Sequence, residues 1–255
     1  MAPVLELKNV NKHFGGVQAV SDMSFVIEKG ELAGLIGPNG AGKTTIFNLV
    51  TGVYDVSDGD IIFQGKNLKG LKPFQVIRLG IARTFQNLRL FAASTVLENV
   101  MTAAQRHHQY SFAEALTHMG RWGRMEKVIR EDSMQLLKRV GLDSRASQAA
   151  GTLPYGLQRR LEIARALSLQ PDLLLLDEPA AGMNADEVEE LNVLITDIHK
   201  DFDLTILLIE HHMDMVMAIC PHIVCMNFGA KIAEGTPEVI QSHPDVLKAY
   251  LGEEE

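Results

Sequence analysis

The chain contains 255 residues, of which 46% are hydrophobic, 22% charged and 6% aromatic. This length allows one or two domains with a full hydrophobic core, and the ordinary composition excludes a disordered chain, a collagen and a disulfide scaffold. The formal net charge of −8 argues against general nucleic-acid binding, because contacts to phosphate backbones need clustered cations.

Apolar segments are short throughout the sequence. The longest runs, such as residues 173–176 and 205–209, fall well below the roughly 18 residues that a membrane span needs. Residues 1–10 lack the basic start and apolar run of a signal peptide. We therefore expect a soluble chain that needs a partner to supply any membrane span. The two cysteines, Cys220 and Cys225, are expected to be reduced thiols packed in the core.

The N-terminal part predicts strands that lead into a loop and a helix. A broken alternation over residues 4–10 and an apolar stretch over 23–27 indicate two strands separated by glycine turns. A third apolar run over 32–36 is followed by the Gly-rich loop 37–42 and by a helical pattern over 44–50. The order of strand, loop and helix is typical of an α/β sheet.

The middle of the chain differs from both ends. From about residue 87 to residue 153 the pattern is mostly helical, with its clearest periodicity over 125–140. After it, the fully apolar runs 173–176 and 204–209 predict strands that are buried on both faces. We therefore expect one α/β core interrupted by a helical insertion.

The C-terminal part predicts a hairpin and two helices. Residues 223–227 and 231–233 flank the turn at 228–230 as two strands of a hairpin. Residues 237–251 have a helical pattern, and Pro244 is expected to separate them into two short helices.

The Gly-rich loop matches the phosphate-binding pattern GxxxxGK[ST]. Glycines let backbone N–H groups turn toward phosphate oxygens, and the helix that follows adds the partial positive charge of its N-terminus. The lysine supplies a cation for the β- and γ-phosphates, the first threonine hydroxyl suits Mg²⁺, and the next threonine is assigned to the α-phosphate region. The residues of this predicted nucleotide site are Gly37, Pro38, Asn39, Gly40, Ala41, Gly42, Lys43, Thr44 and Thr45.

Two acidic residues follow the apolar run 173–176. Ligands of open α/β sheets bind at the carboxyl edge of the strands, so Asp177 is placed to hold Mg²⁺ through water. Glu178 is then placed to orient or deprotonate an attacking water. The phosphate loop disfavours the simpler interpretation of a strand that ends in a polar turn.

These motifs and several others, in this order, resemble the ATP-binding subunits of ABC transporters over essentially the whole chain. The resemblance assigns Phe14 to adenine stacking and Gln86, in the string RTFQ, to the neighbourhood of Mg²⁺ and the attacking water. It assigns His211 to the γ-phosphate. The catalytic set that it implies is Lys43, Gln86, Glu178 and His211, and the implied Mg²⁺ site is Thr44, Gln86 and Asp177.

The family's signature motif corresponds to residues 153–158, and its D-loop to 181–184. The resemblance implies that Tyr155 and Gly156 face the ATP of an opposing subunit. Longer strings, among them RTFQNLRLF from Arg83 and DEPAAG from Asp177, are similar to the ATP-binding subunits of branched-chain amino acid importers.

The sequence departs from the family pattern in two places. Pro154 stands where the signature motif usually has a serine, which removes a hydroxyl and a backbone N–H donor. His211 and His212 stand where the family usually has His-Asp. Adjacent strand residues point to opposite faces, so we expect only one of them, His211, to reach the phosphate.

The implied fold is a P-loop NTPase core of the ABC ATPase type, with an N-terminal antiparallel β subdomain and a helical insertion. The resemblance implies a single domain over residues 1–255, with a catalytic core of 1–87 and 165–255 and a helical subdomain of 88–164. Two subunits would close head to tail around two ATP molecules and reopen after hydrolysis.

The resemblance also implies partners and a location. We expect two transmembrane permease subunits, a homologous second ATPase subunit or a second copy of this chain, and indirectly a periplasmic substrate-binding protein, with no nucleic acid. The chain would lie on the cytoplasmic face of the inner membrane. Alternatives are an ABC ATPase for another cargo, such as a urea or amide importer or a lipid exporter, a soluble ABC ATPase outside transport, and a nucleotide switch without hydrolysis.

Overall fold

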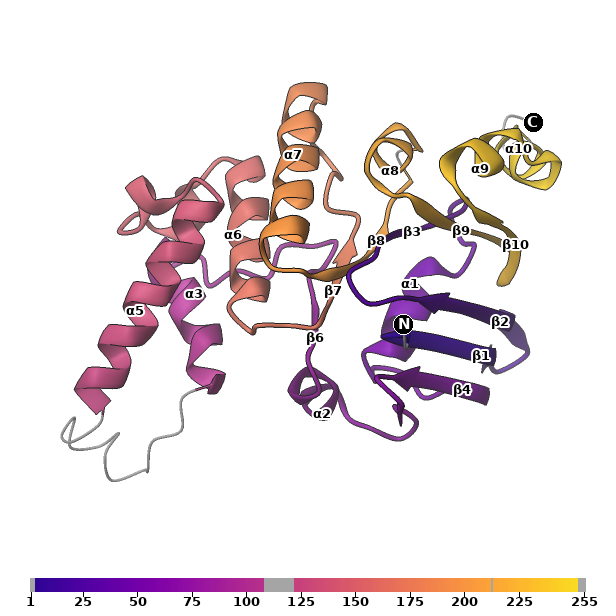
Figure 1. Cartoon of the computed structure of the whole chain (residues 1–255), viewed down its shortest axis with the longest axis horizontal. Coiled ribbons are helices and arrows are strands. Elements are labelled where there is room, and N and C mark those ends of the chain that lie inside the picture. Colours follow the sequence, from indigo (N-terminus) through magenta and orange to yellow (C-terminus); the bar gives the residue numbers. More distant parts are fainter. Residues whose placement is uncertain (1–2, 108–121, 212, 252–255) are drawn as a thin grey trace. The chain divides into compact units, whose positions relative to one another are not determined.

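The computed structural model describes residues 3–107, 122–211 and 213–251. The chain folds as two compact units, residues 1–83 with 172–255 and residues 84–171. The second unit extends a few residues beyond both ends of the segment 88–164 that the sequence assigns to a helical subdomain. Figure 1 colours the chain by residue number and labels most of the helices and strands.

The first unit contains an antiparallel sheet of four strands in the order β2-β1-β4-β5. Its strands are β1 Leu5–Phe14, β2 Val17–Ile27, β4 Asp58–Phe63 and β5 Lys66–Asn67. Buried residues alternate with more exposed ones along β1 and β2, so one face of the sheet covers the core. The predicted antiparallel β part is confirmed, whereas β4 and β5 were missed by the sequence analysis.

A second sheet of the same unit has six strands in the order β10-β9-β3-β8-β7-β6. Its strands are β3 Leu32–Ile36, β6 Ile81–Arg83, β7 Leu173–Asp177, β8 Thr205–Ile209, β9 His222–Asn227 and β10 Ala230–Gly235. Strands β6, β7, β8, β3 and β9 pair in parallel, and β10 closes the predicted hairpin antiparallel to β9. Every residue of β3, β7 and β8 is buried, which explains why these strands are apolar apart from Asp177 and Thr205.

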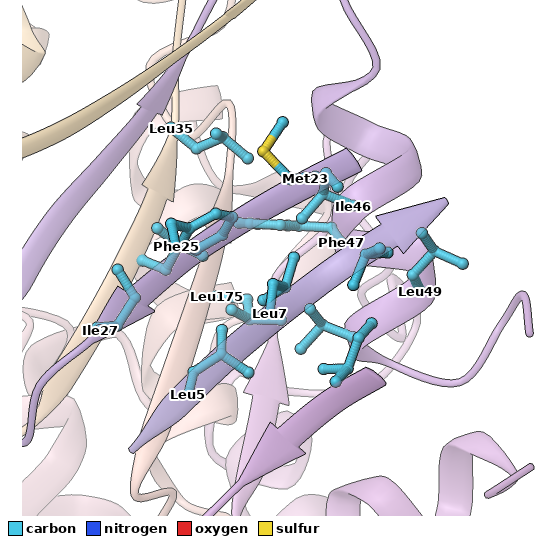
Figure 2. Packing of buried hydrophobic residues seen from close by; sticks show 14 of the residues in the cluster. Leu5, Leu7, Met23, Phe25, Ile27, Leu35, Ile46, Phe47, Leu49 and Leu175 are labelled. Carbon is cyan, nitrogen blue, oxygen red and sulfur yellow. The ribbon is translucent and has the colours of Figure 1, made fainter. Parts of the chain in front are cut away.

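Helix α1, Lys43–Val50, packs into the core that both sheets share. Its apolar side chains contribute to one cluster with residues of β1, β2, β3 and β7. Figure 2 shows Ile46 and Phe47 of this helix beside Leu7, Phe25 and Leu175. The first turn of α1 is therefore held by a rigid core on several sides.

The remaining helices of the first unit are α2 Pro73–Arg78, α7 Ala185–Asp201, α8 Met213–Ile219, α9 Pro237–Ser242 and α10 Pro244–Leu251. Pro244 begins α10, so the predicted break between two C-terminal helices is confirmed. Helix α7, which the sequence analysis missed, begins with a capping box in which Asn184 and Glu187 exchange side-chain and backbone hydrogen bonds of 3.0 Å.

The second unit is helical, with α3 Val96–Ala104, α5 Trp122–Arg139 and α6 Tyr155–Leu167 as its main elements. Short 3₁₀ turns lie at Gln105–His107, Asp143–Arg145 and Ala150–Thr152. Helix α3 contacts both α5 and α6. In the described parts of the chain, no helix combines the length and the apolarity required to cross a membrane.

Both cysteines are free and buried, as the sequence predicts. Burial raises the pKa of Cys220 and of Cys225 to about 12 each. Their thiols therefore stay protonated and unreactive at neutral pH.

Candidate functional site

Three neighbouring parallel strands end at one edge of the six-stranded sheet. Ile209, the last residue of β8, pairs with Leu35 of β3 on one side and with Asp177 of β7 on the other. The segments that follow these strands are the Gly-rich loop, the pair Glu210–His211 and the turn at Glu178. The first unit thus gathers most of the residues that the sequence predicts as a site, at the edge where open α/β sheets bind ligands.

The Gly-rich loop is tightly surrounded by backbone. A Cβ atom on Gly37 would lie 2.1 Å from the carbonyl oxygen of Met226, and one on Gly42 would lie 2.7 Å from the carbonyl oxygen of Ala19. Both glycines also have positive φ, 153° and 107°. Only glycine therefore allows this backbone conformation, in which the loop packs directly against the backbone of β9 and β2.

Lys43 is the first residue of α1, and its side chain folds back over the loop. Its Nζ donates hydrogen bonds to the carbonyl oxygens of Gly37, at 2.5 Å, and of Pro38, at 2.9 Å. The residue is buried, whereas Asn39, Gly40 and Thr44 at the rim of the loop are exposed. A cation is thus fixed under a rim of accessible backbone at a helix N-terminus, which is the arrangement that a phosphate group requires.

Asp177 is a buried carboxylate with a buried cationic partner. Arg83, at the end of β6, donates from Nη2 to Asp177 Oδ2 at 2.6 Å, and from Nη1 to Asn48 Oδ1 of helix α1 at 2.8 Å. This guanidinium links the helix of the phosphate loop to the acidic strand end. Arg83 has no role predicted from the sequence, although a charged residue that closes an apolar strand is a usable signal.

Glu178 and His211 lie side by side at the ends of β7 and β8. Glu178 has a φ of 46°, and its N–H donates to the carbonyl of Ile209 at 2.9 Å. His211 Nδ1 lies 3.9 Å from Glu178 Oε2. A non-glycine residue in the left-handed region is a strained conformation that is common in functional sites. His212 lies outside the described residues.

Glu210 is a further residue of this edge that the sequence analysis missed. It is completely buried, and its carboxylate accepts hydrogen bonds from the N–H of Ala180, at 2.8 Å, and of His211, at 3.1 Å. The carboxylate therefore joins the segment of His211 to the turn that leads into the predicted D-loop. The signal that the sequence offers is an acidic residue directly after the apolar run of β8 and before His211.

Phe14 closes strand β1 as a partly exposed ring. It packs edge to face against Tyr54, with ring centroids 5.0 Å apart and an angle of 76° between the planes. Lys12 Nζ lies 4.9 Å from the Phe14 ring and donates to the carbonyl of Asp55 at 2.8 Å. The cluster presents an aromatic surface, which is the group that a nucleobase needs for stacking.

Three predicted site residues belong to the second unit. Tyr155 and Gly156 are the first two residues of α6, and Pro154 is its N-cap, with φ −52° and ψ 152°. Gln86 lies in the same unit, where the guanidinium of Arg159 on α6 contacts both the Gln86 carbonyl and the Tyr155 hydroxyl. The two segments are therefore connected within this unit.

The described residues fit a nucleotide and a hard divalent cation. The loop offers backbone N–H groups, the N-terminus of α1 and the buried ammonium of Lys43. The hydroxyl of Thr44 and the carboxylate of Asp177 are oxygen ligands of the kind that Mg²⁺ prefers. Glu178 adds a carboxylate that can accept a proton.

Comparison with known sequences gives two matching families. The ABC transporter family matches residues 20–181, and the branched-chain amino acid ATP-binding cassette transporter family matches residues 230–255. The chain is 45% identical over 251 residues to the high-affinity branched-chain amino acid transport ATP-binding protein BraF of Pseudomonas aeruginosa, covering 98% of both chains. It is 43% identical over 251 residues to the corresponding protein LivG of Escherichia coli, again with 98% of both chains covered.

Solved structures of the same family share the fold. The ADP conformation of MJ1267, an ATP-binding cassette of an ABC transporter, superposes with a TM-score of 0.86 at 29% identity and covers 99% of this chain and 100% of that one. A nucleotide-free ATP-binding cassette from an ABC transporter gives a TM-score of 0.84, at 29% identity and with 98% and 99% covered. Since a family match spans more than half of the chain and these relatives span nearly all of it, the chain belongs to the ABC transporter family, as one of its ATP-hydrolysing subunits.

Proposed function

We propose that this chain drives the import of branched-chain amino acids by binding and hydrolysing ATP. The observation that carries the proposal is the pairing of Ile209 with both Leu35 and Asp177, because it brings the phosphate loop, His211 and Glu178 to one sheet edge. The names of BraF and LivG support the cargo, and so does the family match over residues 230–255.

The phosphate loop would bind the triphosphate. Backbone N–H groups of residues 37–45 and the ammonium of Lys43 would hold its oxygens, while the ring of Phe14 would stack on adenine. Lys43 is already oriented by two loop carbonyls, so little side-chain entropy is lost when a phosphate binds. The residues proposed to contact the nucleotide are Phe14, Gly37, Pro38, Asn39, Gly40, Ala41, Gly42, Lys43, Thr44 and Thr45.

Glu178 would act as the general base. A water would attack the γ-phosphorus, the bond to the β–γ bridging oxygen would break, and the carboxylate would accept the proton of the water, giving ADP and inorganic phosphate. His211, 3.9 Å from Glu178, would bind the γ-phosphate and keep the base oriented. Hydrolysis then removes the group that both residues contact.

Mg²⁺, when bound, would neutralise charge on the β- and γ-phosphates. Thr44, Asp177 and Gln86 are the proposed ligands, directly or through water. Among the described residues, no group of three or more His, Cys, Asp or Glu side chains could hold a metal by itself. This agrees with Mg²⁺ chemistry, in which one or two protein oxygens act together with substrate phosphates.

The remaining assignments concern partners. Tyr155 and Gly156 would contact the ATP of an opposing subunit, either a homologous ATPase or a second copy of this chain. Two transmembrane permease subunits would supply the membrane span at the cytoplasmic face of the inner membrane, and a periplasmic binding protein would deliver the cargo. ATP would hold the two ATPase subunits together, and hydrolysis would release them.

Uptake measurements with Glu178→Gln test this function. In cells that lack the chain, the wild type should restore uptake of labelled leucine, isoleucine and valine, whereas Glu178→Gln should not. The purified variant should still bind ATP but hydrolyse it about 10²–10⁴-fold more slowly, which is the usual contribution of a general base. Near-normal hydrolysis would show that another group is the base, and restored uptake of urea or another amide in place of leucine would replace the proposed cargo.

A further inference from the structure

The second unit contains a buried guanidinium that reaches two predicted nucleotide-contacting segments. Arg159, in the second turn of α6, is only 1% exposed and is the bulkiest of the fully buried side chains among the described residues. An arginine carries five N–H donors in a planar fork. Among the described residues the buried Nε of Arg159 has no hydrogen-bond partner, whereas its two Nη groups donate to fixed acceptors. The identity of those acceptors therefore indicates what the residue does.

The acceptors come from both segments. Nη1 donates to the carbonyl of Phe85 at 2.6 Å and to Glu162 Oε2 at 3.0 Å. Nη2 donates to the carbonyl of Gln86 and, at 2.9 Å, to the hydroxyl of Tyr155. One rigid, planar group thus contacts the backbone of the Gln86 segment and the side chain at the start of the signature helix.

Glu162 completes the attachment from the next turn of α6. Its Oε1 accepts the N–H of Phe85 at 3.3 Å, so both backbone polar groups of Phe85 are bound by side chains of a single helix. Burial raises the pKa of Glu162, although the Arg159 cation and the Phe85 hydrogen bond oppose this effect. The charges of this pair therefore act in a dry, weakly screened environment.

We propose that Arg159 is a positioning residue that fixes Gln86 to the signature helix, so that the two segments move as one body. This inference rests on the proposed function, in which Gln86 serves the ATP site of its own subunit and Tyr155 the site of the opposing one. Arg159 then transmits the state of one ATP site to the other. Buried ion pairs gain little net stability over apolar packing, so stability alone does not account for this one.

A mutant cycle between Arg159 and Gln86 tests the proposal. Arg159→Lys keeps the charge and can still pair with Glu162, but a lysine ammonium cannot reach Phe85, Gln86 and Tyr155 together in the planar arrangement. Hydrolysis and ATP binding are measured on the full-length chain, assembled with its transporter partners where hydrolysis requires them. We expect kcat to fall about tenfold while the Kd for ATP stays within about twofold. In a Gln86→Ala background, Arg159→Lys should cause no further loss, because its effect passes through Gln86.

Arg130→Lys is the matched control, because Arg130 is an exposed arginine on α5 of the same unit, and it should keep the wild-type kcat. Unchanged kcat in Arg159→Lys overturns the inference, and so do losses from Arg159→Lys and Gln86→Ala that simply multiply. Parallel losses of kcat, ATP binding and thermal stability would show that Arg159 has only a structural role, which would also overturn the inference. All of these outcomes leave the proposed function standing if the wild type hydrolyses ATP, whereas a wild type without hydrolysis refutes both.

Discussion

Arg83 and Asp177 form a buried ion pair, with 2.6 Å between Nη2 and Oδ2, at the ends of the adjacent strands β6 and β7. The same guanidinium holds Asn48 of α1, so the acidic strand end and the helix of the phosphate loop share one cation. The pair therefore fixes the direction of a carboxylate that the proposed function assigns to Mg²⁺.

Replacing only one member of this pair should destabilise the fold more than replacing both. Arg83→Met leaves the Asp177 charge buried without its partner, and we expect a loss of about 3–5 kcal/mol in the free energy of unfolding, measured by urea denaturation. Arg83→Met combined with Asp177→Leu should recover most of that loss, because two apolar groups replace both charges. Equal stability of the single and double variants would contradict this account.

The close approach of Gly37 to Met226 predicts a loop that tolerates no side chain. Gly37→Ala would place a methyl group 2.1 Å from a backbone carbonyl, so the loop must move, and ATP binding measured by calorimetry should be lost. Gly65→Ala is the control, because Gly65 also has a positive φ of 78° but has nothing within 4 Å of the added atom. It should cost about 1 kcal/mol of stability and leave ATP binding intact. ATP binding by Gly37→Ala at the wild-type affinity would refute the predicted constraint.

Stacking on Phe14 should be specific to the base. Phe14→Ala should weaken ATP binding by about tenfold or more, since base–aromatic stacking contributes about 1–3 kcal/mol. Binding of inorganic tripolyphosphate, which has no base, should not change. Tyr54→Phe keeps the ring that supports Phe14 edge to face and serves as the control in the same titrations. Equal weakening for ATP and tripolyphosphate would mean that Phe14 acts only on the shape of the loop.

A second ionic cluster, centred on His222 at the start of β9, predicts pH-dependent stability. His222 Nδ1 lies 2.6 Å from Glu31 Oε1, and Nε2 lies 3.0 Å from Glu234 Oε1. The other carboxylate oxygen of Glu234, Oε2, lies 2.6 Å from Lys231 Nζ. The hydrogen bond with Glu31 raises the pKa of His222 above its ordinary 6.5 despite burial. Burial alone would raise the pKa of Glu31, but the hydrogen bonds with His222 and the Glu28 amide hold it below its ordinary 4.5.

These shifts set a pH window. The contribution of protonated His222 to the stability of the fold is fully present below pH 6.5 and is lost as the pH rises through the raised pKa. The contribution of ionised Glu31 is present above pH 4.5 and is lost as the pH falls through the lowered pKa. The cluster should therefore stabilise the folded chain most between pH 4.5 and pH 6.5. His222→Gln should cost about 1.5 kcal/mol near pH 6 and clearly less at a pH above the raised pKa, as judged from urea midpoints. The same cost at both pH values would show that the imidazolium contributes nothing.

Much of the fold follows from local patterns in the sequence. The buried strands of residues 173–177 and 205–209 are recognisable because short, mostly apolar runs of this length suit a sheet covered on both faces. The phosphate loop is recognisable because its glycines, lysine and threonine are contiguous. Strand β4 was missed because its acidic residues interrupt the apolar pattern, so that its pairing with β1 defines it. Helix α7 was missed although the sequence carries its signals, since Leu191, Leu194, Ile195 and Ile198 have helical spacing and Asn184 and Glu187 form a capping box.

The site was predictable where its chemistry is local and not where it depends on distant partners. Asp177 and Glu178 can be recognised from the sequence because they directly follow an apolar run. In contrast, Arg83 lies 94 positions from Asp177, and Glu210 lies 30 positions from Ala180. Arg159 likewise meets the carbonyl of Phe85 across 74 positions. No local pattern in the sequence relates residues so far apart, so these contacts can be identified only from the folded structure.

The dependence of the phosphate loop on β9 and its turn has a consequence for synthesis. The carbonyl of Ala41 accepts the N–H of Gly229 at 2.9 Å, and Gly37 lies against Met226. The ribosome synthesises the glycine motif early, but the strand and turn that contact it are made almost 190 positions later. A nascent chain should therefore not bind a nucleotide until residues 222–229 have been made, and truncation before the β9–β10 turn should abolish nucleotide binding although the glycine motif itself is intact.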